Sequence, residues 1–585
     1  MESKGNENMS RKYTNEITVQ IVLSSLKKHK IRRIVVSPGS TNHTFVLSAQ
    51  SDPFFELFSC VDERSAAYMA CGLAAETGEP IALSCTAATA SRNYFPALTE
   101  AYYRKLPILA ITSTRTQCQV GNLIDQQIDR SVQPKDTVKL SVQLPYVKDE
   151  EDFWECELKV NRAILELDHR GKGPVHINMP TRYDHGYECK ELPDVRCIKR
   201  YLPHDELPSL PHNEKIAVFI GSHSLMSKGV EDAIDAFCET NDAVVFCEHT
   251  SGYNGKYGVK FYQALTQRQG NWNSLYPDLV IDMGEIAALT RIKGAKTWRL
   301  SEDGELKDPY KNLEKVFEMT DLEFFTRYSS DKTKGTTYFD KVKKYLDDVR
   351  NTPVELPFSN VYAASKLHAL VPENSVIHFG ILNSLRSWSF YELPQGVCSF
   401  SNVGGYGIDG GVSTLLGASF VHPKKLYYGI FGDLCFFYDM NALGNRHVGN
   451  NVRIMLVNNG LGEEFKTFFN HCYQWGNATN EFVAAEGHFG KKSPLLVKHY
   501  AEDLGFEYMC ASNKEEFENV YRRFVEPSCM EKPLFFELFV TDEDENKALY
   551  NMMNKYVTAQ GSAKSLARQV LGEKGTKFVK GILGK

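Results

Sequence analysis

The sequence predicts an α/β protein made of three doubly wound parallel-sheet domains. Short apolar runs rich in β-branched residues alternate with stretches of helical periodicity in three successive segments of the 585-residue chain. A chain of this length also exceeds what a single hydrophobic core serves. We expect the domains to cover residues 1–195, 210–350 and 351–545, and a helical, basic tail to cover 546–585.

The first segment shows this alternation most clearly. An amphipathic helix is expected over residues 18–28, then a β-branched strand over 31–36 and a Ser-Pro-Gly-Ser turn over 37–40. Small and apolar residues over 65–76 predict a buried helix. Further strands are expected over residues 81–84, 107–112 and 175–178. This order of elements is typical of a parallel sheet covered by helices on both faces.

A linker is expected between the first and second segments. Residues 191–213 are rich in proline and charge and show weak periodicity. The middle segment lacks a complete Gly-x-Gly-x-x-Gly pattern, which favours a scaffold domain. A charged helix over 332–351 then leads into the third segment. The buried strands expected in these two segments cover residues 215–221, 244–247, 279–283, 376–379, 426–431, 452–458 and 534–540.

The composition indicates a protein that acts on small molecules. The net charge of −6 and the pI of about 6.3 give no global attraction to nucleic acid or to anionic membranes. No apolar stretch approaches the roughly 20 residues that span a bilayer, and the polar start lacks the apolar core of a signal peptide. The 14 cysteines include no Cys-x-x-Cys pair, which favours reduced thiols. We therefore expect a cytoplasmic protein.

Polar residues follow two apolar strands of the third segment. Gly432 and Asp433 come directly after one strand, and Asn459 closes the next. Because parallel strands end at the same edge of a sheet, a carboxylate and an amide oxygen can meet there, with the backbone carbonyl of Leu461 as a third oxygen. Magnesium prefers such ligands and shares phosphate oxygens with its substrate. A helix expected over 438–448 would point its N-terminus at that phosphate. Alternatively, Asp433 only caps the following helix.

The run from Gly432 to Asn459 resembles the diphosphate-binding motif of thiamine diphosphate enzymes, with Leu434 in place of the more common glycine. Other motifs are similar to the menaquinone-pathway synthases that make 2-succinyl-5-enolpyruvyl-6-hydroxy-3-cyclohexene-1-carboxylate. They are SPGS at 37–40, DERSAAYMACGLA at 62–74, CTAATASRNYFPALTEA at 85–101, HINMP at 176–180 and GGYGIDGGVSTLLG at 404–417. The similarity covers the first and third segments in order and is faint in the middle.

This resemblance implies a cofactor, a metal and a domain plan. The three domains would be pyrimidine-binding, central and diphosphate-binding. Thiamine diphosphate would bind with Mg²⁺, or another divalent cation such as Mn²⁺, and the metal ligands would be Asp433, Asn459 and the Leu461 carbonyl. Gly432 and Leu434 would lie against the cofactor. The resemblance also implies a homodimer or homotetramer whose active site lies at the subunit interface.

Three further residues match functional positions of the family. Glu63 matches the glutamate that hydrogen-bonds the aminopyrimidine and promotes its imino tautomer. The apolar residues that follow it predict a poorly hydrated place, and desolvation raises the pKa of a carboxyl group. Alternatively, Glu63 is a first-turn residue favoured by the helix dipole. Ile408 matches the bulky residue that bends the cofactor, and Ser384 a position near the diphosphate; core packing and turn formation are their alternatives.

The substrate positions agree with the family only in part. The family binds 2-oxoglutarate and isochorismate through cationic side chains, and arginine suits carboxylates because its fork binds both oxygens. Arg115 and Ser40 match such positions, and Arg291 is a further candidate. Thr41 and Val403 stand where the family has arginine.

A third expected arginine is also missing, because Trp388 occupies its position and Arg386 lies close by. Losing one paired carboxylate contact costs about 2 kcal/mol or more in a desolvated site. The sequence therefore predicts a changed acceptor and a donor without the distal carboxylate, such as pyruvate. His43 and Glu464 replace uncharged family residues and either serve this different substrate or lie at the surface.

The leading hypothesis is a carboligase that decarboxylates a 2-oxo acid and adds the resulting carbanion to an acceptor. One alternative is a simple 2-oxo acid decarboxylase, which protonates the same carbanion. Another is an inactive homologue kept as a binding or regulatory subunit. The retention of Glu63, Asp433 and Asn459 argues against this last alternative.

Overall fold

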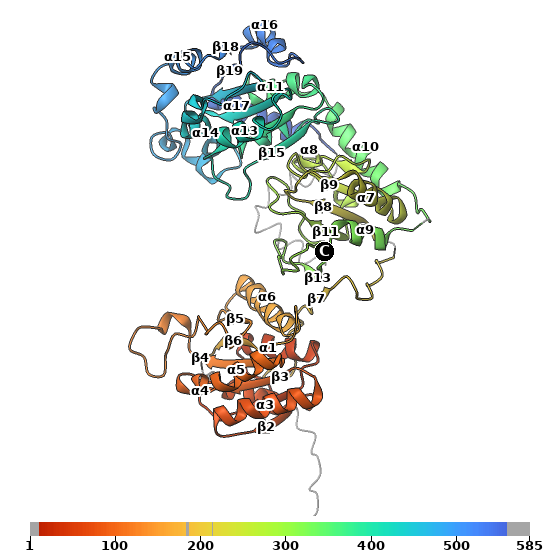
Figure 1. Ribbon diagram of the computed structural model, residues 1–585, viewed down its shortest axis with the longest axis vertical. Coiled ribbons are helices and arrows are strands. Elements are labelled where there is room, and N and C mark those ends of the chain that lie inside the picture. Colours follow the sequence, from red (N-terminus) through yellow and green to blue (C-terminus); the bar gives the residue numbers. More distant parts are fainter. Residues whose placement is uncertain (1–10, 183–185, 213, 331, 559–585) are drawn as a thin grey trace, which may run out of the picture. The chain divides into compact units, whose positions relative to one another are not determined.

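A computed structural model describes residues 11–182, 186–212, 214–330 and 332–558 of the chain. The chain forms two compact units: unit one comprises Met1–Leu202 and Gly304–Val316, and unit two comprises Pro203–Asp303 and Phe317–Lys585. Three parallel sheets with interleaved helices confirm the predicted α/β fold class (Figure 1).

Unit one contains a parallel sheet with strand order β2-β1-β3-β4-β6-β5. Successive residues of β1 pack on opposite faces: Ile34 and Val36 join the core under α1 and α6, and Val35 joins the core under α3 and α5. Helices therefore cover both faces, as the alternating pattern predicts. The strands are β1 (Arg33–Val36), β2 (Glu56–Ser59), β3 (Ile81–Cys85), β4 (Ile108–Thr114), β5 (Leu140–Gln143) and β6 (Val175–Pro180). The helices are α1 (Ile17–Lys28), α2 (His43–Gln50), α3 (Glu63–Thr77), α4 (Thr89–Arg92), α5 (Phe95–Arg104) and α6 (Glu150–Glu166).

The first part of unit two contains strands in the order β10-β9-β8-β11-β12. Their side chains are almost entirely buried, as expected for strands covered on both faces. The strands are β8 (Ile216–Ile220), β9 (Ala243–Cys247), β10 (Gly258–Val259), β11 (Leu279–Met283) and β12 (Lys296–Leu300). The helices are α7 (Lys228–Asn241), α8 (Tyr262–Leu265), α9 (Asp321–Tyr328) and α10 (Thr337–Asn351).

The second part of unit two contains the sheet β15-β14-β16-β17-β19-β18. Tyr428 and Ile430 of β16 pack into one core, and Tyr427 and Phe431 pack into the core on the opposite face. The strands are β14 (Val376–Phe379), β15 (Cys398–Ser401), β16 (Tyr427–Gly432), β17 (Val452–Asn458), β18 (Glu507–Ala511) and β19 (Leu534–Phe539). The helices are α11 (Asn360–Leu367), α12 (Asn383–Trp388), α13 (Gly411–Ser419), α14 (Asp433–Asp439), α15 (Leu496–Asp503), α16 (Lys514–Phe524) and α17 (Asp542–Asn554).

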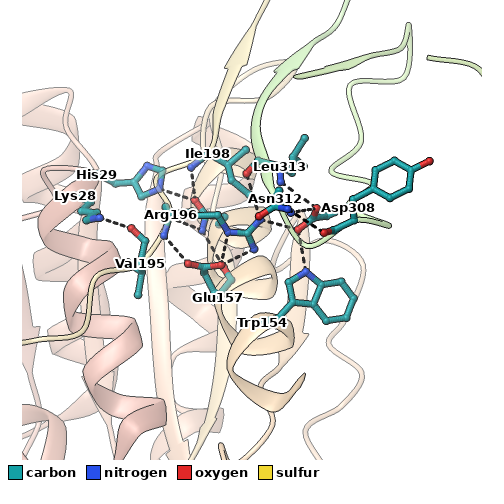
Figure 2. A network of polar contacts seen from close by, with 12 residues as sticks. Lys28, His29, Trp154, Glu157, Val195, Arg196, Ile198, Asp308, Asn312 and Leu313 are labelled. Atoms are coloured by element: carbon teal, nitrogen blue, oxygen red, sulfur yellow. Dashed lines mark hydrogen bonds and ion pairs between the residues drawn. The ribbon is translucent and has the colours of Figure 1, made fainter. Parts of the chain in front are cut away.

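A buried polar network attaches the late segment 304–316 to α6 of unit one, and Figure 2 shows its members. The Arg196 guanidinium donates to Glu157 (Nε to Oε2, 2.6 Å) and lies 2.7 Å from Asp308 Oδ2. Trp154 of α6 donates to the same Asp308 oxygen at 2.9 Å. One cation thus compensates two buried carboxylates that come from distant parts of the sequence.

The structure corrects two predictions of local structure. The helix predicted over 438–448 is wrong, because α14 already begins at Asp433 and gives way to a 3-10 helix over Met440–Gly444. The stretch predicted as a linker includes strand β7 (Lys199–Tyr201), which neighbours β13 (Leu313–Phe317). Residues 559–585 of the predicted basic tail lie outside the described residues, and the predicted domain boundaries stay a prediction. Among the described helices, none has the length and apolar character needed to cross a bilayer.

Candidate functional site

The carboxyl ends of β16 and β17 bring Asp433 and the Asn459 loop together. Asp433 is the first residue of α14 and is buried. Its Oδ1 accepts a hydrogen bond from the backbone N–H of Leu434, and its Oδ2 accepts one from Gly460, both at 2.7 Å. Because β16 and β17 are parallel neighbours, their ends lie at one edge of the sheet. The carboxylate is therefore held in one orientation by both strand ends.

The loop after β17 fixes the orientation of the Asn459 amide. Asn459 Nδ2 donates to Glu463 Oε2 at 2.6 Å, and Asn459 Oδ1 accepts from the Leu461 backbone N–H at 3.3 Å. Gly460 has a positive φ of 78°, which turns the chain sharply between these residues. The Glu463 carboxylate thus holds the amide nitrogen of Asn459 on its own side, and the amide oxygen lies toward the Leu461 N–H.

These strand ends border a cavity of about 240 Å³, here called the unit-two cavity. Ser384 and Ile408 line it together with Asp433 and the Asn459 loop, and Asn360 and Glu545 add two further segments, so six segments of the described chain converge there. Its described lining residues include no lysine or arginine. The lining comprises Asn360, Ile381, Leu382, Asn383, Ser384, Ile408, Gly432, Asp433, Leu434, Cys435, Val457, Asn459, Leu461, Gly462, Glu463, Glu464, Phe465 and Glu545.

Two acidic residues of this cavity, Glu463 and Glu545, have no local sequence signal. Burial raises the pKa of Glu463 well above its usual value, with Glu545 as the next contributor. Burial likewise raises the pKa of Glu545 to about 7, although Asn383 Nδ2 donates to it at 2.9 Å. Glu545 reaches the cavity from α17, far from the other lining residues in sequence, so only the folded chain reveals its place.

The residues present fit a divalent cation with a diphosphate. Burial raises the pKa of Asp433 to about 7, although the hydrogen bonds from the Leu434 and Gly460 backbone act to lower it. Two buried oxygens of the lining, Glu463 Oε1 and Asn383 Oδ1, have no hydrogen-bond partner among the described residues. No three His, Cys, Asp or Glu side chains converge as a metal cluster in the described chain. The donor set is instead carboxylate, amide and carbonyl oxygen, which suits Mg²⁺.

A glycine leaves the backbone accessible at the start of this site. A Cβ built on Gly432 would meet no atom within 4 Å, so its backbone borders open space beside Asp433. Leu434 follows and lines the same cavity. A phosphate group can approach a backbone that carries no side chain most closely.

Glu63 begins helix α3 in unit one. The preceding residue, Asp62, caps the helix by accepting from the Ser65 N–H at 2.9 Å. Glu63 is partly exposed in the single chain, unlike the alanines that follow it into the core. Three exposed apolar side chains lie close to Glu63 in sequence: Val61, which precedes Asp62, and Tyr68 and Met69 on the same helix.

The residues predicted to bind substrate in unit one differ in exposure. Thr41 is buried, and its hydroxyl is 2.6 Å from Thr86 Oγ1 and accepts from the Ala87 N–H at 3.1 Å. Ser40 is exposed. Arg115 is partly exposed and lies 3.4 Å from Asp125. The Thr41 hydroxyl therefore forms its hydrogen bonds with the loop that contains Thr86 and Ala87 and does not face open solvent.

The remaining candidates lie in unit two. Val403 and Trp388 are buried in the core beneath the sheet, where the Trp388 indole donates to Asn360 Oδ1 at 3.2 Å. Arg291 is exposed. The buried Arg386 guanidinium lies 2.8 Å from Glu464 Oε2, so this arginine pairs with an acidic residue that lines the unit-two cavity. In unit one, the His43 ring bonds the Ser40 carbonyl at 2.6 Å.

Comparisons with known proteins agree with the motifs. Residues 18–133 match the family of the N-terminal TPP binding domain of thiamine pyrophosphate enzymes. The chain is 31% identical over 563 residues to the 2-succinyl-5-enolpyruvyl-6-hydroxy-3-cyclohexene-1-carboxylate synthase of Phocaeicola vulgatus, covering 92% of this chain and 98% of that protein. It is 30% identical over 565 residues to the synthase of Bacteroides thetaiotaomicron, with the same coverage, and 27% identical over 549 residues to that of Flavobacterium johnsoniae, covering 89% and 96%. The chain therefore belongs to the thiamine diphosphate-dependent enzymes, in the family of these synthases.

Proposed function

We propose that this enzyme is a Mg²⁺-dependent carboligase that decarboxylates a 2-oxo acid and adds the resulting carbanion to an acceptor. When bound, thiamine diphosphate supplies the electron sink that lets a 2-oxo acid lose carbon dioxide. The chain's own residues bind the cofactor and metal, orient the substrate and handle a proton.

Asp433, Asn459 and the Leu461 carbonyl would hold the divalent cation, Mg²⁺ or Mn²⁺. Support comes from their convergence on the unit-two cavity and from the hydrogen bonds that fix Asp433 and Asn459. Ser384 and the open backbone at Gly432 would face the diphosphate, and Ile408 would contact the cofactor rings.

Glu63 would hydrogen-bond the cofactor's pyrimidine through its carboxyl group. Glu63 belongs to unit one and Asp433 to unit two. The exposed apolar side chains of Val61, Tyr68 and Met69 beside Glu63 support a protein contact there in the active assembly. We therefore propose a homodimer or homotetramer whose active sites lie at subunit interfaces.

The residues at two family arginine positions carry the proposal of a changed substrate. Thr41 and Val403 stand at these positions, and both side chains are buried. A second carboxylate of a substrate would lack these two guanidinium partners. A small donor such as pyruvate does not need them. Ser40, Arg115 and Arg291 remain the proposed contacts to the acceptor or to the reacting carboxylate.

The first experiment tests decarboxylation and the role of Glu63. The purified full-length protein, with thiamine diphosphate and Mg²⁺, is incubated with pyruvate, 2-oxobutyrate and 2-oxoglutarate, and released carbon dioxide is measured. We expect release with pyruvate to exceed release with 2-oxoglutarate, and Glu63→Gln to abolish it while the circular dichroism spectrum is unchanged. Glu76→Gln, on the exposed end of the same helix, is the matched control and keeps activity. No release from any acid would refute the proposal and favour an inactive homologue.

The second experiment separates a carboligase from a simple decarboxylase. Products are analysed by mass spectrometry with and without candidate acceptors, including isochorismate and small aldehydes. A carboligase consumes the acceptor and forms a new carbon–carbon bond. Aldehyde as the only product, whatever acceptor is added, would identify a simple decarboxylase.

A further inference from the structure

Unit one contains a buried arginine without a counter-charge. Arg130 is only 2% exposed, yet no described carboxylate forms an ion pair with it. One of its nitrogens, Nη2, donates to the Ser113 carbonyl at 3.0 Å and to Asn178 Oδ1 at 2.6 Å. Its Nε and Nη1 have no hydrogen-bond partner among the described residues. Burying an ion in this way is unfavourable unless an opposite charge compensates it.

Arg130 lines a small, partly open space of about 10 Å³, here called the Arg130 cavity. Arg92 lines it as well; this guanidinium donates to the Asp129 carbonyl at 2.9 Å and lies over the Phe95 ring. The described lining of the cavity includes no aspartate or glutamate. The described residues that line the space therefore include two arginines and no acidic residue.

The neighbouring histidine does not supply the missing charge. His176 lines the Arg130 cavity, and both ring nitrogens are engaged, with Thr112 Oγ1 at 2.6 Å and Ser141 Oγ at 2.8 Å. Burial, reinforced by Arg130, lowers the pKa of His176 to about 3, so the ring is neutral at physiological pH. The remaining wall includes the apolar side chains of Leu98 and Ala110.

We propose that the Arg130 cavity binds a single monoatomic anion, such as chloride, against the free N–H groups of Arg130. A space of this size accommodates about one water-sized particle, which excludes phosphate, sulfate and substrate carboxylates. A water molecule would satisfy the free N–H groups but leave the charge uncompensated, whereas a halide does both. The described lining of this cavity includes none of the residues proposed to contact the cofactor or the substrate.

The bound anion would stabilise the contact between two neighbouring inner strands of the unit-one sheet, β4 and β6. Arg130 joins Ser113, near the end of β4, to Asn178 on the neighbouring β6, and lies on the segment that follows Arg115. An anion that binds only the folded chain raises its stability with increasing concentration. The expected consequence is a halide-dependent melting temperature.

Crystals of the full-length protein soaked in sodium bromide locate the anion directly. We expect an anomalous difference peak within hydrogen-bond distance of Arg130 Nε and Nη1. In solution, the melting temperature is measured in sodium chloride, sodium bromide and sodium gluconate at equal ionic strength. Chloride and bromide should raise it by at least about 2 °C relative to gluconate.

Three variants complete the test. Arg130→Met should remove both the bromide peak and the difference between halide and gluconate. Arg92→Met keeps Arg130 and should weaken the halide effect, so it serves if Arg130→Met does not fold. Arg104→Met removes a cation from the exposed end of α5 and should leave the halide effect unchanged. Absence of bromide from the cavity in the wild type, or equal melting temperatures in halide and gluconate, would overturn the proposal.

Discussion

The ion pair between Arg386 and Glu464 gives a stability prediction that can be worked from its burial. The side chains are 8% and 23% exposed, with Nη1 2.8 Å from Oε2. Removing one partner of a buried ion pair costs roughly 3–5 kcal/mol, because the other charge stays buried and unpaired. Water reaches Glu464 in part and screens the pair. We therefore expect Glu464→Gln to lower the free energy of unfolding by about 2–3 kcal/mol.

Urea denaturation followed by tryptophan fluorescence measures this change, since Trp388 is buried in the same helix as Arg386, two residues along the chain. Arg386→Met and the double variant complete a mutant cycle. The double variant leaves neither charge unpaired, so its loss should be smaller than the sum of the single losses by about 1–2 kcal/mol. Asp348→Asn is the control, because its pair with Lys344 is exposed and should contribute less than about 0.5 kcal/mol. The reasoning fails if Glu464→Gln destabilises no more than this control.

Three further predictions concern the metal, pH and the network of Figure 2. Loss of a residue that only orients a metal ligand weakens metal binding about 10–100-fold. Asp433→Asn changes a proposed ligand itself and should therefore weaken Mn²⁺ binding by more than about 100-fold. Unchanged Mn²⁺ affinity, measured by electron paramagnetic resonance, would exclude Asp433 as a ligand. Burial lowers the pKa of His176 from 6.5 to about 3. As pH falls, the unfolded chain therefore takes up a proton before the folded chain does. The contribution of the neutral His176 to the free energy of unfolding is complete above the unfolded pKa and is lost at about 1.4 kcal/mol per pH unit below it. His176→Gln should flatten this loss between pH 7 and pH 5 in thermal unfolding, and equal slopes would contradict the assignment. Arg196→Met removes the cation that pairs with the buried Glu157 and Asp308 carboxylates. Hydrogen exchange in segment 304–316 should therefore accelerate by at least about 100-fold, which corresponds to roughly 3 kcal/mol. Unchanged exchange would show that the network does not hold the segment.

The fold class and most buried strands could be predicted, because continuous apolar runs bounded by turns carry a local signal. The runs that became β16 and β17 are examples. Strand β7 could not be predicted, since three residues in a proline-rich stretch become a strand only through pairing with a segment far along the chain. The start of α14 was misplaced because Asp433 is itself the first helical residue, so the polar motif and the helix overlap.

The candidate site was predictable where residues directly follow strands or match family motifs. Asp433, Asn459 and Ser384 carry such signals and line one cavity. Glu545 lacks one, because it comes from a C-terminal helix whose acidic first turn resembles ordinary helix capping. Arg130 was missed for the same kind of reason: nothing in its neighbours indicates that the guanidinium is buried without a carboxylate.

The insertion of segment 304–316 into unit one has a consequence for protein synthesis. The ribosome must make residues 203–303, which belong to unit two, before the last piece of unit one emerges. At about 5–20 residues per second this takes roughly 5–20 s. During that interval Glu157 and Arg196 have been made but Asp308 has not. Unit one therefore remains incomplete on the nascent chain during this interval. A chaperone that binds α6 at this stage would protect the surface that segment 304–316 later covers.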